Sequence, residues 1–263
     1  MARSVLITGG AQRLGAILCR AFAKANWNVW CHYHHSGCAA QLLCDELRHQ
    51  GFSIRAITAD LADNAQLQRM MAYILTQSGP LHCLVNNASC FEQDSANAVD
   101  ITGARQLLEL NLLAPIALSA LMAQSAPGDD HSGERSIIHV LDQKVFNLNP
   151  DYFSYTVSKL ALERVVALQA QALAPQLRVC GVAPGLMFLS GPQTQENFDK
   201  ASQINLLRKA TDPAQVAASC LFLAENPCIT GVTLTVDNGQ HLVPLPRDVM
   251  FVVQGLLKAP HVS

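Results

Sequence analysis

The sequence predicts an α/β protein, with a doubly wound parallel sheet of about seven strands in a single domain. Short runs of apolar and β-branched residues alternate along the chain with longer segments of helical periodicity. The strand runs are apolar almost throughout, as expected for strands that helices cover on both faces. At 263 residues, half of them hydrophobic, the chain is long enough to bury a core of this size.

The predicted elements follow one another in the alternating order that a parallel sheet requires. Strands are expected at residues 4–8, 28–33, 53–58, 83–86, 136–141, 178–183 and 233–236. Helices are expected at residues 14–25, 39–50, 65–77, 103–124, 154–173 and 213–224. Together they predict one domain over residues 1–242.

Two segments fall outside this alternation. Residues 186–209 lack a clean period and mix Gly, Pro, Gln, Asn and Phe, which favours a mobile flap over a substrate. The tail, residues 243–263, contains the apolar run MFVVQGLL. We expect it either to cover the edge of a neighbouring subunit or to fold back on its own chain.

Composition and charge narrow the class of partner. Only 14% of the residues are charged and the formal net charge is −2, which gives no basis for binding nucleic acid or a membrane surface. No apolar run approaches the roughly 18 residues of a spanning helix, and the first residues lead directly into a strand without a signal-peptide layout. Nine cysteines without a Cys-x-x-Cys pair indicate reduced thiols. We therefore expect a cytoplasmic protein with a small-molecule substrate.

The turn after the first strand, TGGAQRLG at residues 8–15, has the composition of a phosphate-binding turn. Glycine lets the backbone approach a pyrophosphate, and a helix that begins near Arg13 offers its N–H groups to the anion. The spacing differs from G-x-G-x-x-G, and a purely structural turn is the alternative. Because of the residues further along the chain, we expect a dinucleotide here, in contact with Gly9, Arg13 and Leu14.

The end of the second strand lacks the acidic residue that holds an adenosine ribose. In its place stand three histidines (His32, His34 and His35), Ser36 and, from the first turn, Arg13, a set that tolerates a 2′-phosphate and favours NADPH over NADH. Tyr33 is expected to contact the cofactor as well. A metal site formed by these histidines with Cys31 and Cys38 is the less favoured alternative. Strand alternation would send His32 and His34 to one face and His35 to the other.

The next two strands also end in residues suited to a cofactor. Asp60 and Leu61 follow the third strand, where they either contact the adenine edge or begin a helix. Asn87 and Ala88 follow the fourth strand and are small enough for a ribose or nicotinamide to pass closely.

Two further residues each allow two interpretations. Phe91 is either a stacking face for a flat ligand or part of the core. Asn111 lies inside an apolar helical stretch, where it either interrupts the helix to hold a water or a backbone carbonyl, or is satisfied internally.

The central stretch, residues 138–162, carries the most suggestive chemistry. Tyr155 and Lys159 are four residues apart on a helical pattern and thus share one face. The lysine is expected to lower the pKa of the phenol and make it a proton donor and acceptor. A surface lysine beside a half-buried tyrosine is the alternative. Asp142 ends the preceding strand, thirteen positions before the tyrosine, where open α/β sheets place their sites.

In order and spacing, these motifs resemble the short-chain dehydrogenase/reductase family over residues 3–242. The motifs are Thr8-Gly9, Arg13-x-Gly15, Asn86-Asn87-Ala88, Asn111, Tyr155-x-x-x-Lys159 and Pro184-Gly185. The resemblance implies a Rossmann-type fold, a homodimer or homotetramer, and cofactor contacts from Pro184 and Gly185. It also implies that Tyr155 is the general acid/base, that Lys159 lowers its pKa and holds the nicotinamide ribose, and that Asn111 positions a proton-relay water.

Two departures from the family pattern are similar to its pteridine reductase branch. Asp142 stands where the family usually has serine, and Arg13 stands where it usually has glycine. Also similar to that branch are His32-Tyr33-His34 with Ser36, the run Asn87-Ala88-Ser89-Cys90-Phe91, and Pro184-Gly185-Leu186. The resemblance implies that Phe91 stacks a pterin against the nicotinamide, that Arg13 and Ser89 contact substrate and cofactor phosphates, and that Leu186 lines the substrate site.

The first hypothesis is therefore an NADPH-dependent reductase of dihydropteridines in tetrahydropterin or tetrahydrofolate metabolism. It requires Asp142 to face Tyr155 and Phe91 to open onto the cleft, so that a proton reaches a ring nitrogen as hydride arrives at the adjacent carbon. The sign of the pKa shift of Asp142 stays open. The second hypothesis is a general carbonyl reductase or alcohol dehydrogenase, in which Asp142 is a tolerated variant. The third is a nucleotide sensor without turnover.

Overall fold

A computed structural model describes residues 3–125 and 134–258 of the chain. Its centre is one seven-stranded sheet with the order β3-β2-β1-β4-β5-β6-β7, and every strand pair is parallel. The strands are β1 (Ser4–Ile7), β2 (Asn28–Tyr33), β3 (Ile54–Thr58), β4 (Cys83–Asn86), β5 (Ser136–Val140), β6 (Arg178–Pro184) and β7 (Thr233–Val236). This confirms the predicted fold class, and each strand ends within one residue of its predicted ends.

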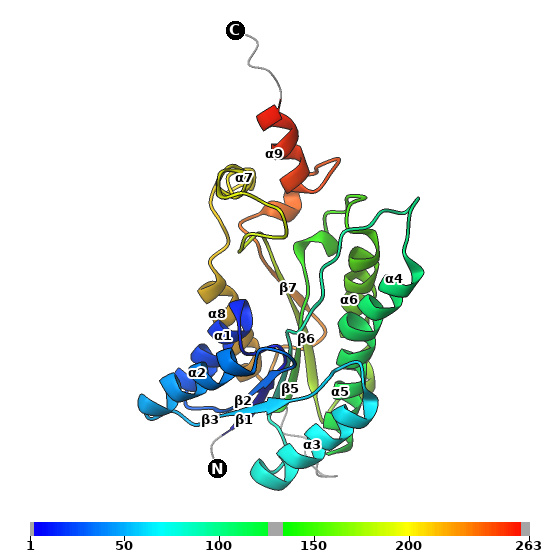
Figure 1. Ribbon diagram of the computed structural model, residues 1–263. Helices are drawn as coiled ribbons and strands as arrows, with labels where there is room; N and C mark the ends of the chain where they lie inside the picture. The colour runs from blue at the N-terminus through cyan, green and yellow to red at the C-terminus, as the bar shows by residue number, and fades with distance from the viewer. Residues whose placement is uncertain (1–2, 126–133, 259–263) are drawn as a thin grey trace.

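Helices form a layer on each face of the sheet (Figure 1). One layer holds α1 (Arg13–Lys24), α2 (Gly37–His49) and α8 (Pro213–Glu225), and the other holds α3 (Asn64–Ser78), α4 (Ile101–Leu108), α5 (Ala114–Gln124) and α6 (Phe153–Leu173). Because successive side chains of a strand point to opposite faces, the apolar residues of each strand pack against both helix layers. Val5 and Ile7 pack into the first layer and Leu6 into the second, and all three are fully buried.

The long helix expected at residues 103–124 is not regular. A π-helical segment, η1 (Glu109–Leu113), separates α4 from α5. By length and composition alone, the stretch Ile101–Gln124 is apolar enough to cross a membrane, with a mean hydropathy of 1.5. This differs from the expectation that no apolar segment approaches that length. In the fold the stretch packs against α3, α6 and β4, and a helix packed on the sheet of a globular domain passes the same test.

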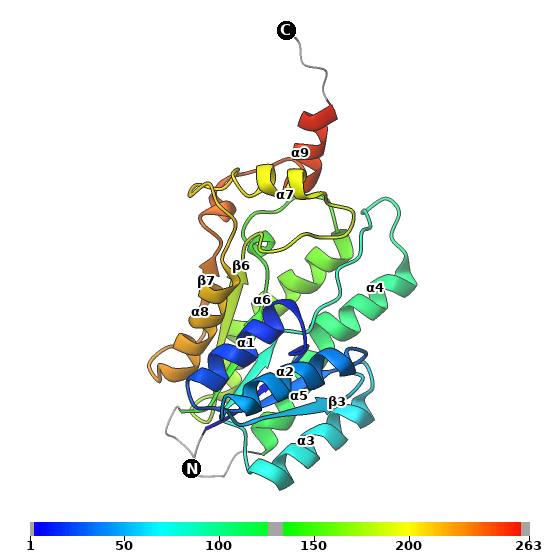
Figure 2. The same ribbon diagram turned by 60° about the vertical axis from the view of Figure 1, so that its left-hand side comes forward.

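Two helices lie in segments where no helix was predicted. The expected flap contains α7 (Gln195–Ala201) and the tail contains α9 (Val249–Lys258). They pack against each other beyond one end of the sheet (Figure 2), and Val253 of α9 is buried beside Ala201 of α7. Of the two outcomes considered for the tail, residues 243–258 fold back on their own chain, whereas residues 259–263 lie outside the described residues.

Candidate functional site

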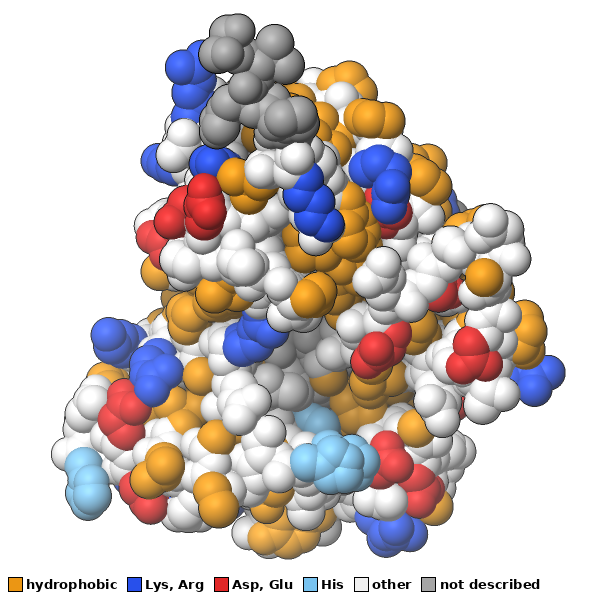
Figure 3. All heavy atoms as spheres, turned by 45° about the horizontal axis from the view of Figure 1, so that its top comes forward, with side chains coloured by type: hydrophobic (Ala, Val, Ile, Leu, Met, Phe, Trp, Pro, Cys, Tyr) orange, Lys and Arg blue, Asp and Glu red, His pale blue; other side chains and the backbone are white. Residues whose placement is uncertain are grey.

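A cleft of about 1400 Å³ opens at the carboxyl ends of the strands. It lies between the sheet with its first turn and the segment that carries the flap and the tail, and Figure 3 looks onto this hollow side of the molecule. Among the predicted site residues, all but Asn111 line it: Gly9, Arg13, Leu14, His32, Tyr33, His34, Ser36, Asp60, Leu61, Asn87, Ala88, Ser89, Phe91, Asp142, Tyr155, Lys159, Pro184, Gly185 and Leu186.

The glycine-rich turn packs closely against the backbone around it, at positions where a side chain would not fit. Gly9 has a φ of 61°, and a Cβ there would lie 3.1 Å from the Cα of Ala88. At Gly15 a Cβ would lie 2.0 Å from the carbonyl oxygen of Gly9. The Asn87 amide donates to the carbonyls of Thr8 and Gly9 at 2.9 and 3.2 Å. The ends of β1 and β4 are thereby joined into one cradle of the kind that a pyrophosphate requires.

Arg13 stands at a position where the family usually has glycine. Its φ is 49°, the left-handed region that favours the glycine found there in most of the family. Its guanidinium donates to the carbonyl of Leu189 at 2.7 Å and lies 5.1 Å from the ring centre of Phe188. Arg13 therefore connects the glycine-rich turn to the start of the flap.

Asn238 also replaces a family glycine, and the structure shows why this position tolerates it. Its φ is 55°, and asparagine adopts this region more readily than most residues. Its amide donates to the carbonyl of Lys209 at 2.9 Å.

The histidines at the end of β2 have two different roles. His32 is buried, its Nδ1 accepts from the N–H of Gly9 at 3.1 Å, and its Nε2 lies 3.0 Å from the carbonyl oxygen of Ala59. Both contacts are made together by the neutral tautomer protonated at Nε2, and burial lowers the pKa of His32 to about 4. His32 thus holds the turn in place as an uncharged group.

His34 and His35 are exposed, and their stacked ring centres lie 3.6 Å apart at the mouth of the cleft beside Ser36. Within the described part of the chain, no group of three or more His, Cys, Asp or Glu side chains is placed to hold a metal ion.

Asp60 lines the cleft and does not cap the following helix. Its carboxylate accepts from the N–H of Ala62 at 3.0 Å. The N-cap of α3 is Asp63, which accepts from the N–H groups of Ala65 and Gln66. Of the two interpretations of Asp60, the helix cap is therefore wrong.

Asn111 is buried in the π-helical segment, where its side chain fixes the loop after β4. Its Nδ2 donates to the carbonyl of Cys90 at 2.9 Å and to Ser158 Oγ at 3.1 Å. Its Oδ1 accepts from the N–H of Cys90 at 2.8 Å and from Ser89 Oγ at 3.2 Å. Asn111 thus interrupts the regular helix to hold a backbone carbonyl, one of the expected alternatives.

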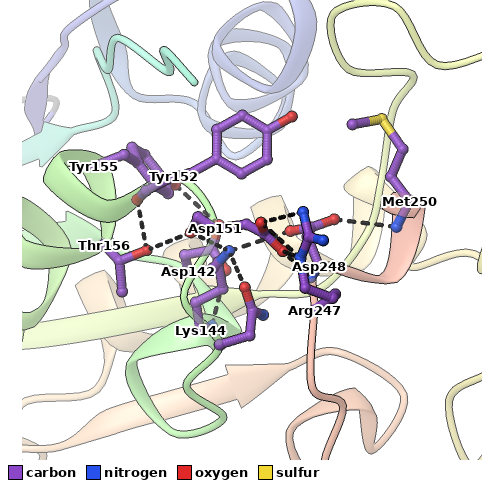
Figure 4. A network of polar contacts seen from close by, with 10 residues as sticks. Asp142, Lys144, Asp151, Tyr152, Tyr155, Thr156, Arg247, Asp248 and Met250 are labelled. Carbon is purple, nitrogen blue, oxygen red and sulfur yellow. Dashed lines mark hydrogen bonds and ion pairs between the residues drawn. The ribbon is translucent and has the colours of Figure 1, made fainter. Parts of the chain in front are cut away.

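Asp142, Tyr155 and Lys159 meet at the end of β5 (Figure 4 shows the first two). The Tyr155 hydroxyl donates to Asp142 Oδ2 at 2.9 Å. The Lys159 ammonium lies 5.8 Å from the Tyr155 ring centre and donates to the carbonyl of Val140 at 2.9 Å. The sequence pattern therefore identified a real cluster with a carboxylate facing the phenol.

The pKa values in this cluster differ from the expectation. Burial, followed by the charge of Asp142, raises the pKa of Tyr155 well above its usual value, a net direction opposite to the lowering expected from Lys159. Burial also raises the pKa of Asp142, although Lys144, Tyr155 and Lys159 act against it. Burial lowers the pKa of Lys159 to about 8. All three groups are held towards their neutral forms.

Phe91 lies at the cleft and not in the interior. Its side chain is 37% exposed, and its ring meets the Tyr155 ring edge-on at 4.6 Å between centres. It also stacks on Tyr152 at 4.1 Å. Both geometric conditions of the pteridine hypothesis are therefore met: the Asp142 carboxylate faces the Tyr155 phenol, and the Phe91 ring lines the cleft.

Several residues at the site were not predicted from the sequence. Tyr152, Lys144, Asp248 and Met250 line the same cleft. Tyr152 is the N-cap residue before α6 and has a φ of 54°, a strained conformation for a tyrosine. Lys144 stands two residues after Asp142, which was the available signal. No sequence signal pointed to Asp248 and Met250, because only the folding back of the tail brings these residues to the cleft.

Comparison with known proteins finds similar sequences and structures that bear the names of reductases. A dihydromonapterin reductase from Escherichia coli O6:K15:H31 is 26% identical over 240 residues, which cover 90% of this chain and 96% of that protein. The crystal structure of FolM alternative dihydrofolate reductase 1 from Brucella canis, complexed with NADP, is 29% identical with a TM-score of 0.87 and covers 99% of this chain and 97% of that one. The Brucella suis FolM structure, in complex with NADP, is 31% identical with a TM-score of 0.86, over 91% and 95%.

The resemblance read from the motifs is thus supported by relatives that span almost the whole chain. The short chain dehydrogenase family matches residues 3–200, which include the glycine-rich turn, Asp142 and the Tyr155–Lys159 pair. The chain belongs to the short chain dehydrogenase family.

Proposed function

We propose that the protein is an NADPH-dependent reductase of dihydropteridines, of the dihydromonapterin, dihydrobiopterin or dihydrofolate type. The observation that carries the proposal is the hydrogen bond of 2.9 Å between Tyr155 and Asp142 opposite the exposed ring of Phe91. A hydroxyl paired with a carboxylate suits proton delivery to a ring nitrogen, and an aromatic plate suits a flat heterocycle. Relatives with reductase names and structures complexed with NADP support both the substrate class and the cofactor.

The residues that line the cleft suit a dinucleotide. The turn of Gly9 and Asn87 would hold the pyrophosphate, Asp60 and Leu61 would contact the adenosine, and His34 with Ser36 would meet a 2′-phosphate. Lys159 and the turn at Pro184 and Gly185 would hold the nicotinamide and its ribose. When bound, NADPH supplies the hydride.

The residues of the chain supply the proton and the orientation. Tyr155 keeps its proton because its pKa is raised, and it donates this proton to the ring nitrogen adjacent to the carbon that is reduced. Asp142, whose pKa is also raised, takes up a proton from water and returns one to the phenolate. Phe91 orients the ring, with Arg13, Ser89 and Leu186 around it. Asn111 acts on this site by holding the loop of Ser89 and Cys90.

The test is oxidation of NADPH with dihydromonapterin, dihydrobiopterin and dihydrofolate, followed by absorbance. Turnover of at least one of them is expected, and its absence with all three contradicts the proposal. Asp142→Ser separates a pteridine reductase from a general carbonyl reductase. It is expected to lower kcat/KM for the pteridine by about 10²-fold or more, whereas a carbonyl reductase would keep or gain activity with the family's usual serine.

We also infer a homo-oligomer, a dimer or a tetramer, in the cytoplasm. The family resemblance supports the assembly, as do exposed apolar side chains on the outer helices, among them Leu113, Val157 and Leu168. The nine cysteines are all free, which supports a reducing compartment. Sedimentation velocity at micromolar concentration tests the assembly, and a single monomer peak would contradict it.

A further inference from the structure

An ion pair between a buried lysine and a partly buried aspartate connects the tail to the loop that follows β5. Lys144 lies in the 3-10 turn η2 (Gln143–Val145), and it is only 2% exposed. Its ammonium donates to Asp248 Oδ2 at 3.2 Å, to Asn149 Oδ1 at 2.9 Å and to the carbonyl of Asp151 at 3.1 Å (Figure 4). A buried ammonium requires a nearby countercharge, and Asp248 of the tail provides it.

The same lysine residue holds the carboxylate of the reacting site. The backbone N–H of Lys144 donates to Asp142 Oδ1 at 2.8 Å, while the Tyr155 hydroxyl donates to Oδ2 at 2.9 Å. The two oxygens of Asp142 are therefore fixed from two sides. The positive charge of Lys144 also lowers the pKa of Asp142 against the effect of burial. Both the position and the net charge of Lys144 thus act on Asp142.

A second contact fixes Asp248 itself. The carboxylate of Asp151 accepts from Arg247 Nε at 2.8 and 2.9 Å and from the backbone N–H of Asp248 at 2.7 Å. The next residues of the tail enter the cleft, where Met250 packs against Tyr152 and Tyr155. The tail is therefore part of the wall of the site, held there by two charged contacts.

We propose that Lys144 and Asp248 are a positioning pair through which the tail controls the protonation of Asp142. Removal of the Asp248 charge leaves an uncompensated ammonium near Asp142, which favours its ionised form. Removal of the Lys144 charge takes away a positive neighbour and leaves Asp248 as a second negative charge, which favours the protonated form. The inference rests on the proposed function only for the reaction in which Asp142 takes part. The effect of the pair on the protonation of Asp142 does not depend on that function.

The other groups around Asp142 are the same in both variants. Tyr155 and Lys159 face it from α6. Arg247 and Asp151 form their own pair beside Asp248. His241 of the turn η3 (Gln240–Leu242), which packs on η2, pairs with Asp237 at 2.7 Å. Opposite shifts in the two variants therefore report the Lys144–Asp248 pair.

The direct test is ¹³C NMR of the aspartate carboxyl groups in the full chain with NADP bound. The Asp142 signal is assigned by its loss in Asp142→Asn. Lys144→Met is expected to raise the pKa of Asp142 and Asp248→Asn to lower it, each by about one unit. The Asp248→Asn change keeps the oxygen that accepts from the N–H of Met250 at 3.1 Å. As the control, Glu196→Gln breaks an exposed pair with Lys200 on α7 and is expected to cause no shift.

A kinetic measurement accompanies the titration. The limb of the pH profile of kcat/KM that disappears in Asp142→Asn is expected to move with the NMR pKa, in opposite directions in the two variants, while the Kd for NADPH stays within about twofold of the parent value. Shifts in the same direction, or none in either variant, overturn the inference. If Lys144→Met does not fold, a downward shift in Asp248→Asn supports the pair and an unchanged pKa refutes it. Failure of the proposed function would appear separately, as an absence of pteridine turnover in the parent enzyme.

Discussion

At the scale of single residues, the site combines groups whose pKa values burial shifts towards the neutral form. Tyr155 and Asp142 have raised pKa values, while Lys159 and His32 have lowered ones. His139 of β5 belongs to the same pattern, because burial lowers its pKa to about 4. A buried group of this kind makes stability depend on pH, since the unfolded chain titrates at the ordinary value.

Replacing His139 is expected to weaken the acid sensitivity of the fold. The unfolded chain takes up a proton at His139 below pH 6.5, whereas the folded chain does so only near pH 4. The stabilisation is thus present above pH 6.5 and is lost as the pH falls towards 4. Between pH 7.5 and 5, the free energy of unfolding should fall by about 2 kcal/mol more in the parent than in His139→Gln.

Urea unfolding at several pH values measures this difference. His49→Gln, at the exposed end of α2, is the matched control and should follow the parent curve. Equal slopes for the parent and His139→Gln would show that the histidine is not held neutral.

At the scale of elements, the π-helical segment η1 places a polar side chain on a helix that is otherwise apolar. The side chain of Asn111 in η1 reaches the loop that carries Ser89 and Phe91 and bonds both backbone groups of Cys90. Asn111 of the π-helical segment therefore helps to fix the loop that carries the Phe91 ring.

Asn111→Leu is expected to harm both stability and activity. It removes the side-chain contacts of Asn111 and leaves Cys90 with an unpaired N–H and carbonyl, at a cost of about 1–3 kcal/mol in the free energy of unfolding. Because the loop of Phe91 loses its anchor, kcat/KM should fall by about tenfold or more. Thermal unfolding and steady-state kinetics measure the two effects.

The control lies on the same helical stretch. Ser119 is buried in α5 and donates to the carbonyl of Pro115 at 2.7 Å, away from the cleft. Ser119→Ala should lower stability without lowering kcat/KM. A loss of activity in both variants would mean that Asn111 acts through stability alone.

At the scale of the whole molecule, the sheet supplies the cofactor side of the cleft, and the flap with the tail supplies the other side. The buried contact between α7 and α9 holds this second side together: Val253 packs beside Ala201, and Asn197 Nδ2 donates to the carbonyl of Met250 at 3.0 Å. Substrate binding should therefore depend on the packing of the tail more than cofactor binding does.

Val253→Ala tests this division. The cavity left by the lost methyl groups should loosen the tail and raise KM for the pteridine several-fold, while KM for NADPH changes little. Leu256→Ala, at a position 69% exposed on the same helix, is the control and should leave both constants unchanged. An equal rise of both KM values in Val253→Ala would show that the tail does not act selectively on the substrate side.

The sequence by itself determined the sheet, the order of its elements and the cluster of Asp142, Tyr155 and Lys159. Apolar runs and helical spacing are local signals, and the ends of parallel strands meet at one edge of a sheet by topology alone. Short helices such as α7 lack such a signal, and nothing local places Asp248 beside Lys144. Only the tertiary structure decided the contact between Lys144 and Asp248, because the two residues lie about a hundred positions apart along the chain. It also decided the direction of the pKa shifts, because burial is their largest cause.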